Sequence, residues 1–160
     1  MSRRDQAAEG GPAVHISALP AVRKTAYPPG LAERVRGRER RRLGDAFGLT
    51  QFGVNFTTVE PGSQSALRHW HTREDELVYV ISGELILVTD AGEQPVSAGV
   101  VVGFPAGRSD AHCFVNRSDA PAQFIEVGSR IEDDISHYPD DDLMWAPDGE
   151  TPLHKDGEPY

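Results

Sequence analysis

Residues 61–83 read PGSQSALRHWHTREDELVYVISG, and this stretch decides how the rest of the chain is interpreted. It places His69, His71 and Glu76 within eight residues, between two runs that are typical of β-strands. Because side chains alternate along an extended strand, His69 and His71 should point the same way and Trp70 to the opposite face. Imidazole nitrogens and a carboxylate oxygen together are ligands for a divalent transition metal. The stretch indicates a metal site, although a His-x-His pair alone is equally compatible with two surface histidines.

Residues 99–116 read GVVVGFPAGRSDAHCFVN and supply a further histidine from elsewhere in the chain. An apolar run ends at the turn Pro105-Ala106-Gly107, and His112 begins the next expected strand. A closed coordination site requires a ligand from a separate strand, because one hairpin cannot surround an ion. We therefore predict that His112 joins the two histidines and the glutamate of the first stretch around one ion.

The two stretches together resemble the paired motifs of the cupin superfamily over residues 52–127. The first motif has the family's spacing, because four residues separate His71 from Glu76 and six separate Glu76 from Gly83. The second motif is matched by Gly99, Pro105, Gly107, His112 and Asn116. The spacers before His69 and His112 are one and two residues longer than usual, in or beside turns where insertions cost little.

This resemblance implies a small, single-domain, metal-binding cupin with an all-β fold, a double-stranded β-helix or jelly-roll barrel. It implies that the metal ligands are His69, His71, Glu76 and His112. It also implies a homodimer, because cupin relatives are commonly homodimers. The fold hosts many reactions, so the resemblance does not by itself specify an activity.

Short apolar runs separated by turn residues also predict an all-β sandwich or barrel. The expected strands cover residues 51–60, 67–71, 76–82, 84–89, 94–96, 100–104, 111–115 and 122–127. The strands at 67–71 and 76–82 should form a hairpin. A short edge strand is expected at 14–19.

Three segments divide the chain in this interpretation. Residues 1–45 form an N-terminal arm, with disorder expected in residues 1–13. Residues 46–130 form the barrel. Residues 131–160 form an acidic tail that packs on the barrel or on a partner subunit, because Ile135, Tyr138, Leu143, Met144 and Trp145 give it apolar side chains to bury.

Composition restricts the class of protein. With 160 residues, 38% of them hydrophobic, the chain is expected to be a soluble globular domain. No apolar run approaches the roughly 18 residues of a membrane helix, and the N-terminus lacks the apolar block of a secretory signal. We therefore expect a cytoplasmic protein without membrane association. The single Cys113 cannot form an intramolecular disulfide, and strand parity with His112 makes it a core residue rather than a ligand.

The net charge of −9 is unevenly distributed. Residues 1–45 contain ten Lys or Arg against five Asp or Glu, whereas residues 46–160 contain six against twenty. The acidic barrel is not expected to bind nucleic acid. The basic run 34–42, RVRGRERRR, is compatible with a nucleic-acid patch, but Gly37 and Glu39 interrupt it. We favour a solvated segment that lies on the acidic surface of its own domain or of a partner subunit.

Two groups in the tail, the carboxylates of residues 140–142 and the side chain of His154, could in principle bind a metal. The carboxylates of residues 140–142 lack the spacing of a calcium loop, so we expect them to be solvated. His154 is expected at the surface, although a tail that crosses the barrel mouth would bring it into the pocket. The sequence does not decide between these positions for His154.

The predicted ligand set favours an enzyme. Three imidazoles and one carboxylate would leave two positions of an octahedral metal open to a small-molecule substrate. Fe, Mn, Zn and Ni all suit this set, and the residues do not select among them. We favour a dioxygenase, with an isomerase or lyase also open. No residue is assigned as catalytic, but Glu74, Tyr79 and Glu126 are candidates for acid–base chemistry, and Phe104 and Phe114 for the pocket wall.

Two alternatives to an enzyme stay open at this point. The protein is compatible with a non-catalytic cupin that binds or senses a small molecule. It is also compatible with a structural barrel whose histidines are inert. Metal analysis and oxygen consumption would separate these possibilities.

Overall fold

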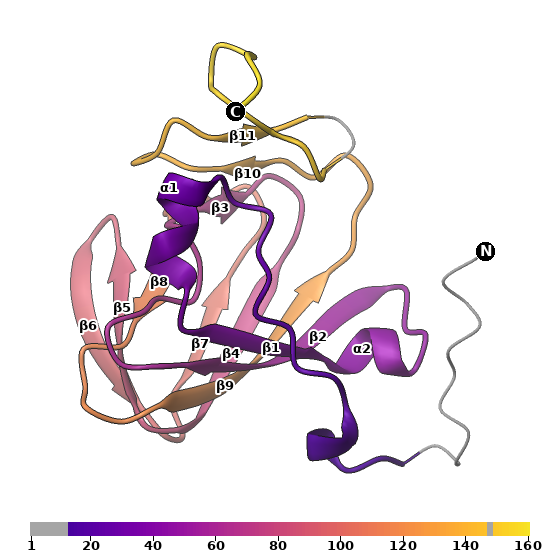
Figure 1. Ribbon diagram of the computed structural model, residues 1–160, viewed down its shortest axis with the longest axis vertical. Coiled ribbons are helices and arrows are strands. Elements are labelled where there is room, and N and C mark those ends of the chain that lie inside the picture. The colour runs from indigo at the N-terminus through magenta and orange to yellow at the C-terminus, as the bar shows by residue number, and fades with distance from the viewer. Residues whose placement is uncertain (1–12, 147–148) are drawn as a thin grey trace.

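Two β-sheets packed face to face form the body of the molecule in the computed structural model, which describes residues 13–146 and 149–160 (Figure 1). The helical elements are η1 (Ile16–Ala18), α1 (Pro29–Ala32), η2 (Glu33–Val35) and α2 (Leu43–Ala46). The strands are β1 (Arg38–Arg42), β2 (Phe52–Val59), β3 (Trp70–His71), β4 (Glu76–Ser82), β5 (Glu84–Thr89), β6 (Gly92–Ser97), β7 (Val101–Phe104), β8 (Cys113–Val115), β9 (Ala122–Ser129), β10 (Ser136–His137), β11 (Met144–Trp145) and β12 (Pro152–Leu153). The predicted all-β jelly-roll fold is confirmed.

The larger sheet has the strand order β1-β2-β9-β4-β7, and the smaller has the order β6-β5-β8. Alternation of side chains along each strand sends one apolar set into the space between the sheets. This set is Val59, Val78, Val80, Leu85, Leu87, Val96, Phe114, Ala122 and Phe124. Burial of these side chains is the main driving force that closes the sandwich.

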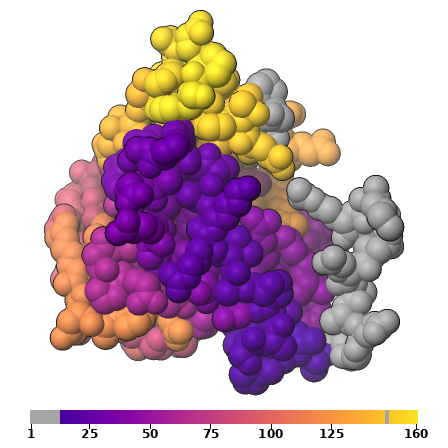
Figure 2. Space-filling view, in the orientation of Figure 1, coloured from indigo at the N-terminus to yellow at the C-terminus, as the bar shows by residue number. Residues whose placement is uncertain are grey.

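Residues from both ends of the chain make a second cluster, at one end of the barrel. Its buried members are Leu67, Tyr138 and Leu143, and Tyr27, Leu31 and Trp145 pack against them. Figure 2 shows the yellow C-terminal segment and the indigo N-terminal segment meeting at this end. The tail therefore packs on the barrel of its own chain, and it is bound there partly by Arg68, which donates to both carboxylate oxygens of Asp140.

Two local predictions were wrong. Residues 67–71 do not pair with β4, because β3 pairs with β10 of the tail, with Ser136 opposite His71. Residues 16–18 form a 3₁₀ turn instead of a strand, and the side chain of His15 accepts a hydrogen bond from the Ser17 amide at its start. A local side-chain cap here replaces the backbone pairing that a strand would need.

The basic run also differs from the expectation of a solvated segment. Its second half is β1, which pairs antiparallel with β2 at the edge of the larger sheet. The disorder expected for residues 1–12 concerns a segment outside the described structure. Among the described residues, no helix is long or apolar enough to cross a membrane.

Two residues of the sequence motifs have structural roles. Gly83 joins β4 to β5 with a φ of 78°, and a Cβ there would lie 2.7 Å from the Cα of Ala122. Only glycine fits both the left-handed backbone and this close approach. Asn116 is fully buried, and its Nδ2 donates to the carbonyls of Val59 and Ala120. Both residues fix turns next to the apolar core.

Candidate metal centre

The structure brings together the four side chains that the sequence predicts as ligands. Donor atoms of His69, His71 and Glu76 lie within 4.8 Å of one another. His112 joins them, because its Nε2 is 3.2 Å from Glu76 Oε2 and its ring centroid is 4.9 Å from that of His69. Paired backbone hydrogen bonds between His69 and His112 hold these two residues side by side. Trp70 points the other way and stacks on His137, as alternation predicts.

Hydrogen bonds orient two of the histidines. His69 Nδ1 lies 2.7 Å from the carbonyl oxygen of Leu67, and His71 Nδ1 lies 2.6 Å from Asp134 Oδ2. A nitrogen that donates to an oxygen carries the proton, so the Nε2 atom of each ring is left with a free lone pair. Such outer hydrogen bonds commonly fix the tautomer and orientation of metal-binding histidines.

Asp134 is anchored by several donors in addition to His71. Its Oδ1 accepts from the amide of Arg73 at 2.7 Å, the amide of Glu74 at 3.2 Å and the hydroxyl of Thr72 at 3.2 Å. Burial opposes ionisation of Asp134, but the hydrogen bonds from His71 and the Arg73 amide outweigh it and lower its pKa. The carboxylate thus connects the tail rigidly to the turn between β3 and β4.

Electrostatics keep the donors in forms that suit a cation. Burial, with the nearby charge of His112, lowers the pKa of His69 to about 3, so this ring is neutral at pH 7. Burial alone would raise the pKa of Glu76, but the hydrogen bond and charge of His112 lower it to about 2. The centre therefore presents a neutral imidazole next to an ionised carboxylate.

The ring of His112 is held on its face by an aromatic side chain. Phe104 stacks on it with ring centroids 3.4 Å apart and an interplanar angle of 6°. His112 Nδ1 is buried and has no hydrogen-bond partner among the described residues. Packing, rather than an outer hydrogen bond, fixes the orientation of this ring.

A cavity of about 360 Å³ contains all four donor residues. It is open beside Glu76 because the next two strands on that side of β4, β9 and β2, carry glycine at the same level: Gly128 pairs with Glu76, and Gly53 pairs with Gly128. At the next inward-facing level of the same strands lie Asn55 and Glu126. The cavity therefore has the donors at one level of the barrel and a polar pair at the next.

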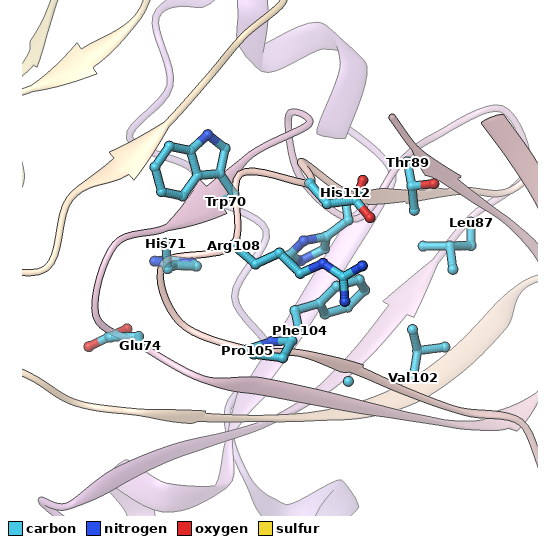
Figure 3. Close-up of a pocket in the computed structure, with 12 residues that line it drawn as sticks. Trp70, His71, Glu74, Leu87, Thr89, Val102, Phe104, Pro105, Arg108 and His112 are labelled. Carbon is cyan, nitrogen blue, oxygen red and sulfur yellow. The ribbon is translucent and has the colours of Figure 1, made fainter. Parts of the chain in front are cut away.

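A smaller cavity of about 150 Å³ lies on the other side of His112. Figure 3 shows Leu87, Thr89 and Val102 at one end of it, Trp70, His71 and Glu74 at the other, and His112 and Phe104 between them. Only two of the four donors, His71 and His112, line it. The larger cavity is the better candidate for substrate, since every donor is accessible from it.

The structure separates the three candidate acid–base residues. Tyr79 is 46% exposed on the outer face of β4, so it is excluded from the site. Glu74 lines both cavities, and burial raises its pKa. Glu126 lines the larger cavity, where its Oε1 accepts from Asn55 Nδ2 at 2.9 Å and lies 3.1 Å from Arg40 Nε. Of the expected wall residues, Phe114 lines the larger cavity and Phe104 the smaller one.

Most residues for which a surface or core position was expected are found there. Cys113 is buried, and burial raises the pKa of its thiol to about 11. His154 lies outside both cavities, stacked on Tyr160 and bonded to Asp142. The expectation of solvated carboxylates at 140–142 was wrong for Asp141, whose side chain is only 8% exposed and pairs with Arg34. Asp140 pairs with Arg68, so these ion pairs help to hold the tail in place.

Sequence reasoning missed three residues of the site. Asp134 lies in an acidic cluster 63 positions from the histidine that it contacts, and nothing local distinguishes it from a solvated aspartate. Arg40 belongs to a run interpreted as solvated. Asn55 lies in an expected strand, and the alternation of side chains along that strand could have placed it on the inner face.

The donor set fits a divalent transition metal. The rings of His69 and His71 each have a free Nε2 atom. The Nε2 atom of His112 lies next to the ionised carboxylate of Glu76, which completes the group. Nitrogen and oxygen donors without thiolate suit Fe, Mn, Ni, Co or Zn. His71 belongs to β3 and Glu76 to β4, while His69 and His112 directly precede β3 and β8 and face each other across an antiparallel bridge, so separate segments of the chain supply the donors.

Comparison with known proteins supports this assignment of the fold. A family model of the cupin domain matches residues 55–128. The chain is similar to a sugar phosphate isomerase of the cupin superfamily from Silicibacter pomeroyi. The two are 43% identical, with a TM-score of 0.87 over 93% of this chain and 96% of that one. A protein provisionally named sugar phosphate isomerase, from Acidithiobacillus ferrooxidans, is 32% identical, with a TM-score of 0.66 over 74% and 78%.

A more distant similarity is to a protein with a different named activity. The polyketide cyclase of Streptomyces resistomycificus is 25% identical, with a TM-score of 0.58 over 73% of this chain and 78% of that one. A search of curated proteins found no match.

Proposed function

This chain belongs to the cupin superfamily, and we propose that it is a metal-dependent isomerase of a small polyhydroxylated aldehyde or ketone. The observation that carries the proposal is the shared cavity. It contains the group of three histidines and Glu76 together with a second, separately anchored carboxylate, Glu126. The name of the 43% identical relative, a sugar phosphate isomerase, supports the same reaction class.

The proposed metal ligands are His69, His71, Glu76 and His112. A divalent ion held by them would act as a Lewis acid that stabilises negative charge on the substrate oxygens. Asp134 and the Leu67 carbonyl orient two of the rings, and Phe104 orients the third. These contacts hold the donors in place before substrate arrives, so little reorganisation is needed on binding.

Glu126 is the proposed proton-transferring group. Interconversion of an aldose and a ketose removes a proton from the carbon next to the carbonyl and returns one to the former carbonyl carbon, with a proton also moving between the two oxygens. Atoms and electrons balance without an oxidant. Asn55 donates to Glu126 and Arg40 lies against it, and these two contacts position the carboxylate for proton transfer.

Two functions from the sequence analysis stay predictions. A dioxygenase would use the same donors, and so would a non-catalytic small-molecule binder. Neither gives a role to the anchored Glu126, whereas an isomerase does. We therefore place the isomerase first.

The proposal is tested by assaying the purified protein, reloaded separately with Fe(II), Mn(II), Zn(II), Ni(II) and Co(II), for interconversion of aldose and ketose phosphates in heavy water. Isomerisation with deuterium incorporated at the exchanged carbon is expected with at least one metal. Oxygen uptake with catechol-like or diketone substrates, in the absence of isomerisation, would favour the dioxygenase. Metal and ligand binding without either activity would favour the passive binder.

We also propose that two copies of the chain associate through the outer face of the larger sheet. Leu77, Tyr79 and Val101 are 45%, 46% and 59% exposed there, and Tyr79 pairs directly with Val101 across β4 and β7. Covering such a patch removes apolar surface from water. Light scattering should show a dimer that Tyr79→Glu converts to a monomer, and a monomeric unmodified protein would contradict the proposal.

A further inference from the structure

The basic run places alternate arginines on the inner face of the barrel edge. In β1, Arg38, Arg40 and Arg42 pair with Val59, Thr57 and Asn55 of β2. Residues directly opposite in an antiparallel pair share a face, and these β2 residues face the interior. Three guanidinium groups therefore point to the same side of the sheet edge as the cavity.

These three arginines and Lys24 line a third cavity, of about 230 Å³. Its wall also includes Thr25 and the aromatic rings of Tyr27, Tyr138 and Trp145. Within the described part of the chain, no aspartate or glutamate lines it. A cavity with four cations and no acidic wall residue is distinctive in a protein whose net charge is −9.

The cations of this cavity are only partly neutralised. Arg40 is paired with Glu126, while the nearest carboxylate to Arg42 is Asp45, at 3.8 Å. Arg38 is 6% exposed and donates to a neutral acceptor, the carbonyl of Ser65. Burial and the charge of Arg40 lower the pKa of Arg38 to about 10. An anion entering the cavity would relieve this repulsion.

The cationic cavity borders the cavity of the metal centre. Arg40, Tyr27 and Tyr138 line both. Arg40 is the direct link, because the same side chain contacts Glu126 on the metal side. One elongated ligand can therefore have an anionic end among the arginines and a neutral end beside the donors.

We propose that Lys24, Arg38, Arg40 and Arg42 form a binding site for the phosphate monoester of the substrate. Guanidinium groups match the oxygens of a phosphate in geometry and charge, which favours a phosphate over a single carboxylate. The placement of the carbonyl end beside Glu126 rests on the proposed function. The anion site itself rests only on the charge and shape of the third cavity.

The alternative anion site is the smaller cavity of Figure 3, which has Arg108 on its wall. It offers one arginine, and Asp110 lines it as well. The balance of charge therefore favours the cavity at β1.

The test uses isothermal titration calorimetry on the full chain after treatment with a chelator, so that phosphate cannot bind to a metal ion. Inorganic phosphate is the first probe, followed by ribose 5-phosphate and ribose. The variant is the double substitution Lys24→Gln/Arg42→Gln, chosen because both residues are exposed. The control is Arg36→Gln/Arg117→Gln, which removes two exposed positive charges elsewhere. Arg108→Gln tests the alternative cavity.

Phosphate and ribose 5-phosphate should bind the unmodified protein, and ribose should bind at least tenfold more weakly than its phosphate. The Lys24→Gln/Arg42→Gln variant should lose at least tenfold in affinity for phosphate, while the control should stay within twofold. No phosphate binding to the unmodified protein would overturn the proposal, and so would an equal loss in the control. A loss confined to Arg108→Gln would also overturn it. Phosphate binding with the expected pattern but without isomerase activity would support the anion site and reject the proposed function.

Discussion

The interior of the barrel has two halves that differ in chemistry although the same strands build both. At one end, β2, β4 and β9 contribute Val59, Val80 and Phe124, which are completely buried. At the other end these strands contribute Asn55, Glu76 and Glu126, which line a cavity. The change from apolar to polar side chains occurs at corresponding levels of these neighbouring strands. The apolar core that stabilises the fold is therefore separate from the polar groups of the cavity.

This separation has a physical reason. Buried apolar side chains stabilise by leaving water, whereas buried ionisable groups cost free energy unless they are paired. Two of the strands, β2 and β9, carry glycine where the donors lie, and the tail supplies Asp134 as the partner of His71. Variants in the apolar half should therefore change stability, and variants in the polar half should change activity and metal binding.

The largest expected effect is on turnover, from Glu126→Gln. Glutamine keeps the shape and still accepts from Asn55, but it cannot take up a proton. Turnover of the sugar phosphate that the unmodified protein converts should fall by about 10²–10⁴-fold. Metal content and melting temperature should stay unchanged, and so should the turnover of the surface control Glu84→Gln. Full turnover in Glu126→Gln would show that another group transfers the proton.

The next effect is on stability, from Phe124→Ala in the apolar half. Truncation leaves a cavity in the fully buried cluster, and the free energy of unfolding should fall by about 3–5 kcal/mol. Urea denaturation measures the loss, and metal content per folded molecule should not change. The control Phe52→Ala removes a ring that is 40% exposed, so its loss should be only about 0.5 kcal/mol. Equal losses in the two variants would contradict the assignment of the core.

The smallest effect is on metal affinity, from Asp134→Asn. An asparagine can turn its amide nitrogen towards His71 Nδ1, which moves the ring proton to Nε2 and removes the lone pair needed for a metal. Affinity should fall by about 10–100-fold in a metal titration. Asp133→Asn is a matched control, because Asp133 is 91% exposed and asparagine tolerates its positive φ of 63°. If both variants bind metal equally well, Asp134 does not position His71.

Local patterns in the sequence were sufficient to predict the barrel and to propose four ligand residues that the structure places close together. Alternating and continuous apolar runs located the strands, and parity placed His69 and His71 on one face with Trp70 on the other. His69 and His71 are only two residues apart, and the turn from His71 to Glu76 is short. Convergence of His112 needed the second stretch and the similarity of both to known motifs.

Contacts between distant segments could not be predicted in the same way. Six arginines among nine residues favour a solvated segment, yet edge pairing with β2 makes residues 38–42 of that run a strand. Likewise, Asp134 contacts His71 only because the tail folds back to pair β10 with β3. A pattern within either segment contains no information about its partner.

The most direct test of the metal centre is the metal content of the unmodified protein beside that of the His69→Ala/His112→Ala variant, both loaded with the same divalent ion and desalted. Elemental analysis should find about one ion per chain in the unmodified protein and less than about a tenth in the variant. Circular dichroism should show the same β-structure in both, since neither histidine belongs to the apolar cluster. Full occupancy in the variant, or no ion in the unmodified protein, would contradict a metal centre at these four side chains.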